Sequence, residues 1–195
     1  MEIISDKFRL RPLRKEDMAN KVRWYNNPEV NRTLLLDEQL ELEKTLEWFD
    51  KHKDDKSRRE FAVESKDGRP IGITGLIHID LVHKTAECFC VIGEKEWWGK
   101  GIGTEVHRVL VDWGFRELGL DKVWADIKAE NTAIIRVIEK LGFKVEGTLR
   151  QERLIAGRRI DIVRIGLLKE EFYAIHPELA LTDPVEIKDN RRRND

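Results

Sequence analysis

The sequence has few cysteines, no long apolar run and almost no net charge. Only Cys88 and Cys90 occur among its 195 residues, too few for the disulfide framework of small secreted domains. No stretch approaches the roughly 20 consecutive apolar residues of a membrane helix. The chain also opens without an apolar signal segment. We therefore expect a cytoplasmic protein with no membrane partner.

The charge balance argues against general binding to polyanions. Lys and Arg total 36 and Asp and Glu total 37, so nucleic acid is an unlikely partner on composition. The run Arg191 to Arg193 could touch RNA, but Asp189 and Asp195 flank it, and a solvated tail is the simpler interpretation. The five histidines show no metal-ligand spacing with each other or with the cysteines. We predict no metal site.

The chain length suits one domain with a sizeable core. We place that domain at residues 1–175 and a polar C-terminal tail at residues 176–195. Alternating and helical apolar patterns divide the domain further. The expected strands cover residues 8–12, 61–64, 71–79, 85–92, 123–127, 143–155 and 158–168. The expected helices cover residues 15–25, a segment after Leu36 with the stripe Leu42, Leu46 and Phe49, then 104–118 and 132–141.

Asp67-Gly68 is typical of a tight hairpin turn, so the strands on either side are expected to pair in antiparallel. Their apolar residues, from Ile71 to Ile79 at every second position, are expected on one face. Strand 85–92 has little polar alternation apart from Glu87, which predicts a central strand covered on both sides.

A glycine-rich turn, Trp98-Gly99-Lys100-Gly101-Ile102-Gly103, follows this central strand and precedes a helix. Such a turn places backbone amides and a helix N-terminus around one point, which suits a phosphate group. A dinucleotide fingerprint is excluded because Thr104 stands where its third glycine would be. A P-loop is excluded because its spacing between Gly93 and the Gly99-Lys100 pair does not fit. A purely structural tight turn remains the alternative.

The turn resembles the signature of the GNAT superfamily of N-acetyltransferases: Gln or Arg, two residues, Gly, one residue, then Gly or Ala. Only Trp98, at the first position, departs from it. With tryptophan at this position, the sequence resembles the branch of the superfamily that acetylates ribosomal proteins at an N-terminal alanine or serine. Residues 7–172 carry further matches in the same order, namely Phe8-Arg9-Leu10-Arg11-Pro12-Leu13, Trp24-Tyr25-Asn26-Asn27-Pro28-Glu29-Val30, Asn131, Glu139-Lys140-Leu141-Gly142-Phe143, Gly147 to Arg150, and Asp161.

This resemblance implies an α/β fold of the α+β type. It consists of a mixed, mostly antiparallel seven-stranded sheet flanked by helices and splayed between strands 85–92 and 123–127. The implied co-substrate is acetyl-CoA, whose pantetheine lies in the splay. The residues implied to bind it are Cys90, Val91, Ile92, Trp98, Gly99, Lys100, Gly101, Ile102, Gly103, Thr104, Asn131, Arg136 and Lys140. For Arg136 and Lys140 a solvated helix face is an equal alternative.

The implied reaction is direct attack of a primary amine on the thioester in a ternary complex. A protein N-terminus needs about 1 kcal/mol to lose its proton at pH 7, whereas an aliphatic amine needs roughly 4.6 kcal/mol. Glu87 is the candidate base, with an ion-paired strand residue as the alternative. The Val91 amide is the candidate oxyanion donor, provided that a strand bulge aims it. Cys90 could carry an acyl group, but a buried structural thiol suits an apolar strand better.

Two family positions lack their usual side chains. The tyrosine that serves many members as the general acid falls at Ile138, and a common serine falls at Ile134. Trp24, Tyr25, Asn26 and Asn27 lie where this branch closes over its acceptor, although core aromatics and a helix cap explain them too. The acceptor is either a protein N-terminus or a small amine, and a homodimer is possible. A non-catalytic acyl-CoA sensor or interaction module is the second hypothesis.

Overall fold

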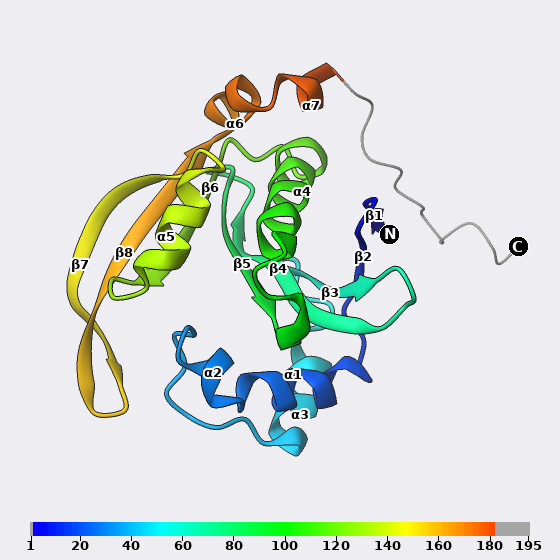
Figure 1. The fold of residues 1–195 in the computed structure, drawn as a ribbon, viewed down its shortest axis with the longest axis vertical. Coiled ribbons are helices and arrows are strands. Elements are labelled where there is room, and N and C mark those ends of the chain that lie inside the picture. Colours follow the sequence, from blue (N-terminus) through cyan, green and yellow to red (C-terminus); the bar gives the residue numbers. More distant parts are fainter. Residues whose placement is uncertain (1, 182–195) are drawn as a thin grey trace, which may run out of the picture.

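A computed structural model describes residues 2–181, whose strands form one sheet (Figure 1). The strand order is β1-β2-β3-β4-β5-β6-β8-β7. The seven expected strands are all present, and within the described residues an eighth, β1, pairs with the first of them. The strands are β1 (Ile3–Ile4), β2 (Phe8–Pro12), β3 (Arg59–Ser65), β4 (Pro70–Asp80), β5 (Thr85–Ile92), β6 (Lys122–Lys128), β7 (Lys144–Ile155) and β8 (Arg158–Leu168).

Helices cover the sheet and its two ends. Figure 1 shows α1, α2 and α3 gathered at one end of the molecule and α6 and α7 at the other, with the β7–β8 hairpin arching along one side. The helices are α1 (Asp17–Tyr25), α2 (Pro28–Asn31), α3 (Leu42–His52), α4 (Ile102–Glu117), α5 (Thr132–Glu139), α6 (Lys169–Ile175) and α7 (Pro177–Leu181), with a short 3-10 turn at Lys95–Trp97. No helix within residues 2–181 has the length and hydrophobicity that a membrane span requires.

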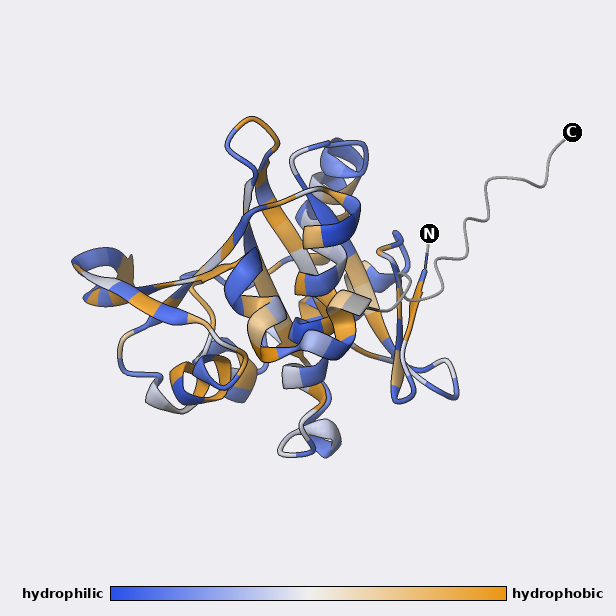
Figure 2. Ribbon diagram, turned by 90° about the horizontal axis from the view of Figure 1, so that it is seen from above, coloured by the Kyte–Doolittle hydropathy of each residue, from blue (hydrophilic) through white to orange (hydrophobic). Residues whose placement is uncertain are grey.

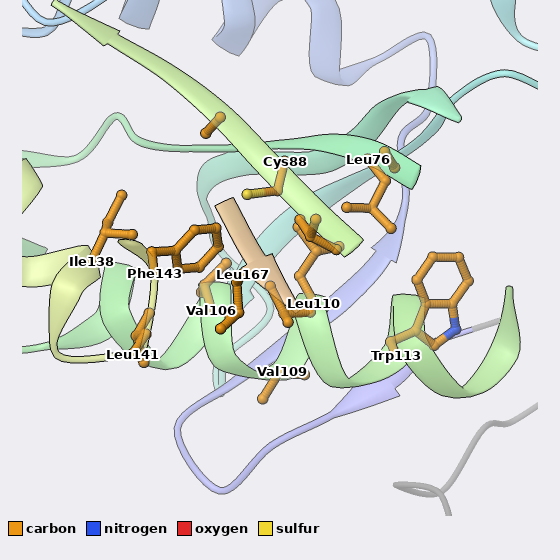
Figure 3. Packing of buried hydrophobic residues seen from close by; sticks show 14 of the residues in the cluster. Leu76, Cys88, Val106, Val109, Leu110, Trp113, Ile138, Leu141, Phe143 and Leu167 are labelled. Atoms are coloured by element: carbon orange, nitrogen blue, oxygen red, sulfur yellow. The ribbon is translucent and has the colours of Figure 1, made fainter. Parts of the chain in front are cut away.

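The main core lies between the sheet and the helices α4 and α5. Val106 and Leu110 of α4 meet Leu76 and Cys88 of the central strands, and Ile138 of α5 joins the same cluster (Figure 3). Figure 2 shows hydrophobic residues concentrated in the central strands and on the helices that pack against them. Because side chains alternate along a strand, Glu87 and Phe89 point to the opposite face of β5 from Cys88.

The sheet opens between its two central strands. β5 and β6 are parallel and pair only at Thr85 to Glu87, where Glu87 lies opposite Trp124. Beyond this point β5 stays paired with β4 as far as Ile92, and β6 stays paired with β8 as far as Lys128. Among the described strands, Cys88 to Ile92 therefore have no partner on the β6 side. This region, called the splay below, confirms the expected opening of the sheet.

Three features differ from the expectations. A register shift on β4 between Ile77 and Asp80 interrupts the expected alternation, and His78 there has a φ of 49°. On α3 the predicted inward residue Leu42 is 45% exposed, whereas Thr45 is buried. The prediction of a solvated tail from residue 176 onward is wrong for the first residues of that segment. Helix α7 forms there, and Leu179 packs against the core. Residues 182–195, including Arg191 to Arg193, lie outside the described part of the chain.

Candidate functional site

The glycine turn ends at the N-terminus of α4 with its amides available. Gly99 and Gly101 have φ values of 71° and 74°, a region that residues with a Cβ rarely enter. The first helical hydrogen bond runs from the Glu105 N–H to the Gly101 carbonyl, and no side chain caps the helix. The amides of Ile102, Gly103 and Thr104 therefore precede the hydrogen-bonding pattern of the helix. This arrangement fits a pyrophosphate group.

The predicted residues of the turn differ in their exposure to solvent. Ile102 is buried in the core, while Gly99, Lys100 and Gly101 are exposed. Gly103 lies against β5, since a Cβ built on it would meet Ile92 at 3.8 Å. Close approach of the helix to the strand brings the amide cluster to the end of the splay.

Trp98, the departure from the signature, ties the turn to the sheet. Its indole N–H donates a 2.7 Å hydrogen bond to the Ile92 carbonyl. The last residue of β5 and the first residue of the turn are thereby held together. The expected pairing of the Ile92 carbonyl with the pantetheine must share this acceptor with Trp98.

The register of β5 corrects the expectation for Val91. Pairing with β4 is unbroken from Glu87 to Ile92, so the bulge expected to aim the Val91 amide is not on this strand. The Gly93 N–H donates to the Ile71 carbonyl. Because hydrogen-bonding directions alternate along an antiparallel ladder, Val91 also turns toward β4. Cys90 and Ile92 then direct their backbone groups into the splay, which leaves them as the predicted partners of pantetheine.

Cys90 has the environment of a structural thiol. Burial raises the pKa of Cys90 to about 12, which keeps the thiol protonated and weakly nucleophilic at neutral pH. This matches the interpretation that Cys90 carries no acyl group.

Helix α5 supplies no proton donor at the two substituted positions. Ile138 is buried at 3% exposure, and Ile134 is half-buried against the core. Asn131 caps the helix by accepting a 3.4 Å hydrogen bond from the Ile134 N–H, and its contact with pantetheine stays a prediction. Arg136 and Lys140 are exposed, as expected for a solvated face, and their contact with the co-substrate also stays a prediction.

The residues predicted to lie beside the acceptor, Trp24 to Asn27, mainly contact other parts of the protein. Trp24 is buried, packs over Gly93 and donates a 3.0 Å hydrogen bond to Glu94. Asn26 bonds to both backbone groups of Leu40, at 2.8 and 2.7 Å. Asn27 caps α2. These contacts match the alternative of core aromatics and a helix cap.

Tyr25, the fourth residue predicted to lie beside the acceptor, is half-buried. Burial raises the pKa of its phenol, and the nearby Glu60 carboxylate acts in the same direction. A phenol in this state keeps its proton at neutral pH. The contacts of Trp24, Asn26 and Asn27 shape the segment from α1 to α3, and direct contact of the four residues with an acceptor stays a prediction.

Glu87 lies at the apex of the splay, bonded to a residue that the sequence analysis missed. Its Oε2 is 2.8 Å from Nδ1 of His78. The Glu87 side chain is 18% exposed, while that of His78 is 69% exposed. The ring of His78 is nearly parallel to that of Trp124, with centroids 6.3 Å apart. A carboxylate, an imidazole and an indole thus meet where the strands separate.

Further charged side chains of β6 and β8 lie near Trp124. The Arg164 guanidinium is 4.0 Å from the centre of the Trp124 ring and forms two hydrogen bonds with Asp126. The Asp126 carboxylate raises the pKa of Arg164, and Glu87 adds to this effect. Lys128, two residues beyond Asp126, is buried, and its ammonium donates a 3.0 Å hydrogen bond to the Arg32 carbonyl. The end of α2 is thereby tied to β6.

A sheet splayed beside a glycine turn at a helix N-terminus fits the class of acyl-CoA-dependent acyltransferases. The sequence model of the "Acetyltransferase (GNAT) domain" family matches residues 7–144. The chain belongs to the GNAT acetyltransferase family and uses acetyl-CoA as its co-substrate to acetylate an amine. This confirms the enzyme hypothesis over the non-catalytic sensor.

Known relatives match along most of the chain. The spermidine N(1)-acetyltransferase of Escherichia coli (strain K12) is 34% identical over 168 residues, covering 86% of this chain and 89% of the relative. That of Vibrio cholerae is 30% identical over 173 residues, covering 87% and 97%. A crystal structure of spermidine N-acetyltransferase from Vibrio cholerae with CoA and spermine superposes with a TM-score of 0.81 at 28% identity, covering 86% of this chain and 99% of the other.

The ribosomal branch is also represented among the relatives. The putative ribosomal N-acetyltransferase YdaF of Bacillus subtilis is 36% identical, but only over 106 residues, or 54% of this chain and 57% of the relative. Superfamily membership is thus confirmed. A protein N-terminus as acceptor and a homodimer stay predictions.

Proposed function

We propose that this acetyltransferase acts on a primary amine of a small polyamine of the spermidine class. The observation that carries the proposal is the Glu87 carboxylate at the apex of the splay, opposite Trp124. A carboxylate next to an aromatic ring suits a substrate with several ammonium groups, through charge attraction and cation–π contact. The spermidine acetyltransferases that match most of the chain support the same acceptor class.

The segment between α2 and α3 adds negative charge near this face. Its exposed carboxylates are Asp37, Glu38 and Glu41, and Glu43 follows in the first turn of α3. Asp37 accepts a hydrogen bond from the Ala156 N–H, which holds the segment against the β7–β8 hairpin. Lys128 fixes the start of the segment through Arg32. An extended cation can therefore meet carboxylates beyond the reacting amine.

Within this site the amine proton goes to the Glu87–His78 pair. The amides of Ile102 to Thr104 hold the pyrophosphate, and the backbone of Cys90 and Ile92 holds the pantetheine. Since the side chain of Ile138 has no ionisable proton to donate, the CoA thiolate takes its proton from the attacking nitrogen or from water.

A direct test follows the release of free CoA from acetyl-CoA. Purified protein is incubated with spermidine, spermine, putrescine, or peptides that begin with alanine or serine, and the products are identified by mass spectrometry. We expect monoacetylated spermidine or spermine to form fastest. Acetylation of the peptides alone would overturn the polyamine proposal. Binding of acetyl-CoA without turnover of any of these amines would also overturn the polyamine proposal.

A further inference from the structure

His78 and Glu87 form a hydrogen-bonded pair in which Glu87 is half-buried and His78 is exposed. Glu87 lies on β5 within the sheet, and His78 lies on β4 at the register shift between Ile77 and Asp80. The φ of 49° turns His78 out of the regular pleat. The 2.8 Å contact uses Nδ1, the ring nitrogen nearer the backbone. Backbone irregularity thus places an imidazole on the carboxylate that the sequence alone presents as the base.

The contact fixes the state of the imidazole. A carboxylate accepts hydrogen bonds and donates none, so Nδ1 carries the hydrogen and the neutral ring keeps a lone pair on Nε2. No hydrogen bond between described residues uses Nε2 of His78. The nearly parallel indole of Trp124 limits rotation of the ring. A carboxylate on Nδ1 that leaves Nε2 free for a proton is the arrangement of the catalytic His–Asp pair in serine hydrolases.

We propose that Nε2 of His78 is the general base of the acetyl transfer, and that Glu87 is the positioning residue that orients the ring and stabilises its charged form. The inference deepens the proposed function and rests on it, because the ammonium of a polyamine must lose a proton before it can attack. Imidazoles as a class change protonation near neutral pH, whereas carboxyl groups do so several pH units lower. The exposed His78 ring can also return its proton to solvent.

The bond changes balance without a further reactant. The substrate ammonium gives one proton to Nε2 of His78, and the freed lone pair forms the C–N bond with the thioester carbon. Collapse of the tetrahedral intermediate breaks the C–S bond. The second proton of the attacking nitrogen moves to the thiolate, directly or through water. The imidazolium then releases its proton to solvent, leaving N-acetylated amine and free CoA.

The charges around His78 come from three neighbouring strands. β5 contributes Glu87, and β8 contributes Arg164, which lies on the Trp124 ring and is paired with Asp126 of β6. On the chain segment that follows His78, Asp80 is hydrogen-bonded to His83 at 2.8 Å. The carboxylate in direct contact with His78 is therefore Glu87.

The experiment compares four variants by their pH–rate profiles. His78→Asn keeps an N–H donor for Glu87 and tolerates the positive φ, but has no basic nitrogen. His78→Gly suits the same φ and leaves room for added imidazole. Glu87→Gln removes the carboxylate charge. His83→Asn is the matched control, since His83 is similarly exposed, at 76%, and is also paired with a carboxylate.

We expect His78→Asn and His78→Gly to lower kcat about 100-fold or more, the usual contribution of a general base, with little change in KM for acetyl-CoA. In both variants the fall in rate at low pH should disappear, and added imidazole should restore activity to His78→Gly. In Glu87→Gln the rate should still fall at low pH, but this fall should begin at a lower pH than in the wild type. The loss of kcat relative to the wild type should be smaller than for the His78 variants. His83→Asn should match the wild type in all respects.

The opposite pattern overturns the proposal. If Glu87→Gln abolishes the fall in rate at low pH while the His78 variants keep it, Glu87 is the base. If imidazole fails to rescue His78→Gly although its circular dichroism spectrum is native, His78 is not the base. The wild-type rates with spermidine and with peptides decide the proposed function separately. The variants are compared on whichever amine the wild type acetylates.

Discussion

The indole N–H of Trp98 is 2.7 Å from the carbonyl oxygen of Ile92, so the glycine turn is anchored to the strand that lines the splay. The family signature has Gln or Arg at this position, and tryptophan here serves as a link between two parts of the co-substrate site. The predictions below begin with this link.

Trp98→Phe should weaken binding of CoA and acetyl-CoA. The variant keeps the ring but loses a hydrogen bond worth about 1 kcal/mol, which corresponds to roughly a fivefold rise in Kd. Isothermal titration calorimetry measures the change. Trp97→Phe is the control, because Trp97 lies next in sequence, packs partly against the core and has the Lys100 ammonium over its ring. Equal effects of the two substitutions would contradict a specific role for Trp98.

Gly101→Ala should impair the pyrophosphate site through the backbone. At a φ of 74° an alanine costs about 1–2 kcal/mol, and relief of this strain would turn the amides away from the ligand. We expect roughly a tenfold rise in the Kd for CoA. Gly68→Ala is a matched control at a φ of 81°, also with no atom within 4 Å of the added Cβ. It should lower the melting temperature similarly and leave CoA binding intact.

Lys128→Met should loosen the acceptor side of the site. The ammonium of Lys128 holds the Arg32 carbonyl from the far strand of the splay, and methionine fills similar space without this bond. We expect a several-fold rise in KM for the amine and little change in KM for acetyl-CoA. Lys122→Met, on the same strand but paired with Glu146 at the surface, should change neither value. A change confined to KM for acetyl-CoA would refute the assignment.

Arg11→Met should destabilise the fold without altering the site directly. Arg11 is buried between Asp17 and Glu64, with two 2.7 Å hydrogen bonds to Asp17. Its loss leaves two carboxylates buried without their main partner, which typically costs about 3–5 kcal/mol. Arg9→Met removes a more exposed partner of Glu64 and should cost less than about 1 kcal/mol. Urea unfolding at pH 7 separates the two.

The same cluster should make the stability sensitive to acid. Burial alone would raise the pKa of Glu64, but hydrogen bonds from Arg11 and Arg9 outweigh it and the pKa is lowered. A carboxylate with a lowered folded-state pKa contributes stability above its unfolded pKa, near 4.3, and loses it as the pH falls through the folded value. Glu64→Gln should therefore flatten the decline of unfolding free energy below about pH 4.3. An unchanged slope would contradict this.

Local sequence patterns predicted the elements whose periodicity is strong. The nearly continuous apolar run of β5 and the apolar stripe of α4 predicted both elements, and Gly119 and Gly142 have the positive φ typical of a glycine that follows a helix. The glycine turn was predictable because its conformation depends on its own residues. Short elements such as α2, where Asn27 caps only one turn, carry too little periodicity to be recognised.

The apex of the splay was predictable only in part. Glu87 was apparent as an acidic residue within an apolar strand, but His78 becomes its partner through a register shift between strands, and that shift has no local signature. Lys128 contacts Arg32 from 96 residues away, a distance over which one sequence carries no pairing information. The side chains of Trp24, Asn26 and Asn27 were noticed, but their hydrogen-bond partners, which the sequence does not identify, determine what these side chains contact.

The short β5–β6 pairing gives the co-substrate a structural part as well as a chemical one. Between Cys88 and Ile92 the sheet has a free inner edge, and an extended pantetheine arm with its two amides can occupy it as an additional strand would. Loading with acetyl-CoA then completes the sheet and links its two halves. Heat resistance of the protein should accordingly rise and fall with the supply of acyl-CoA around it.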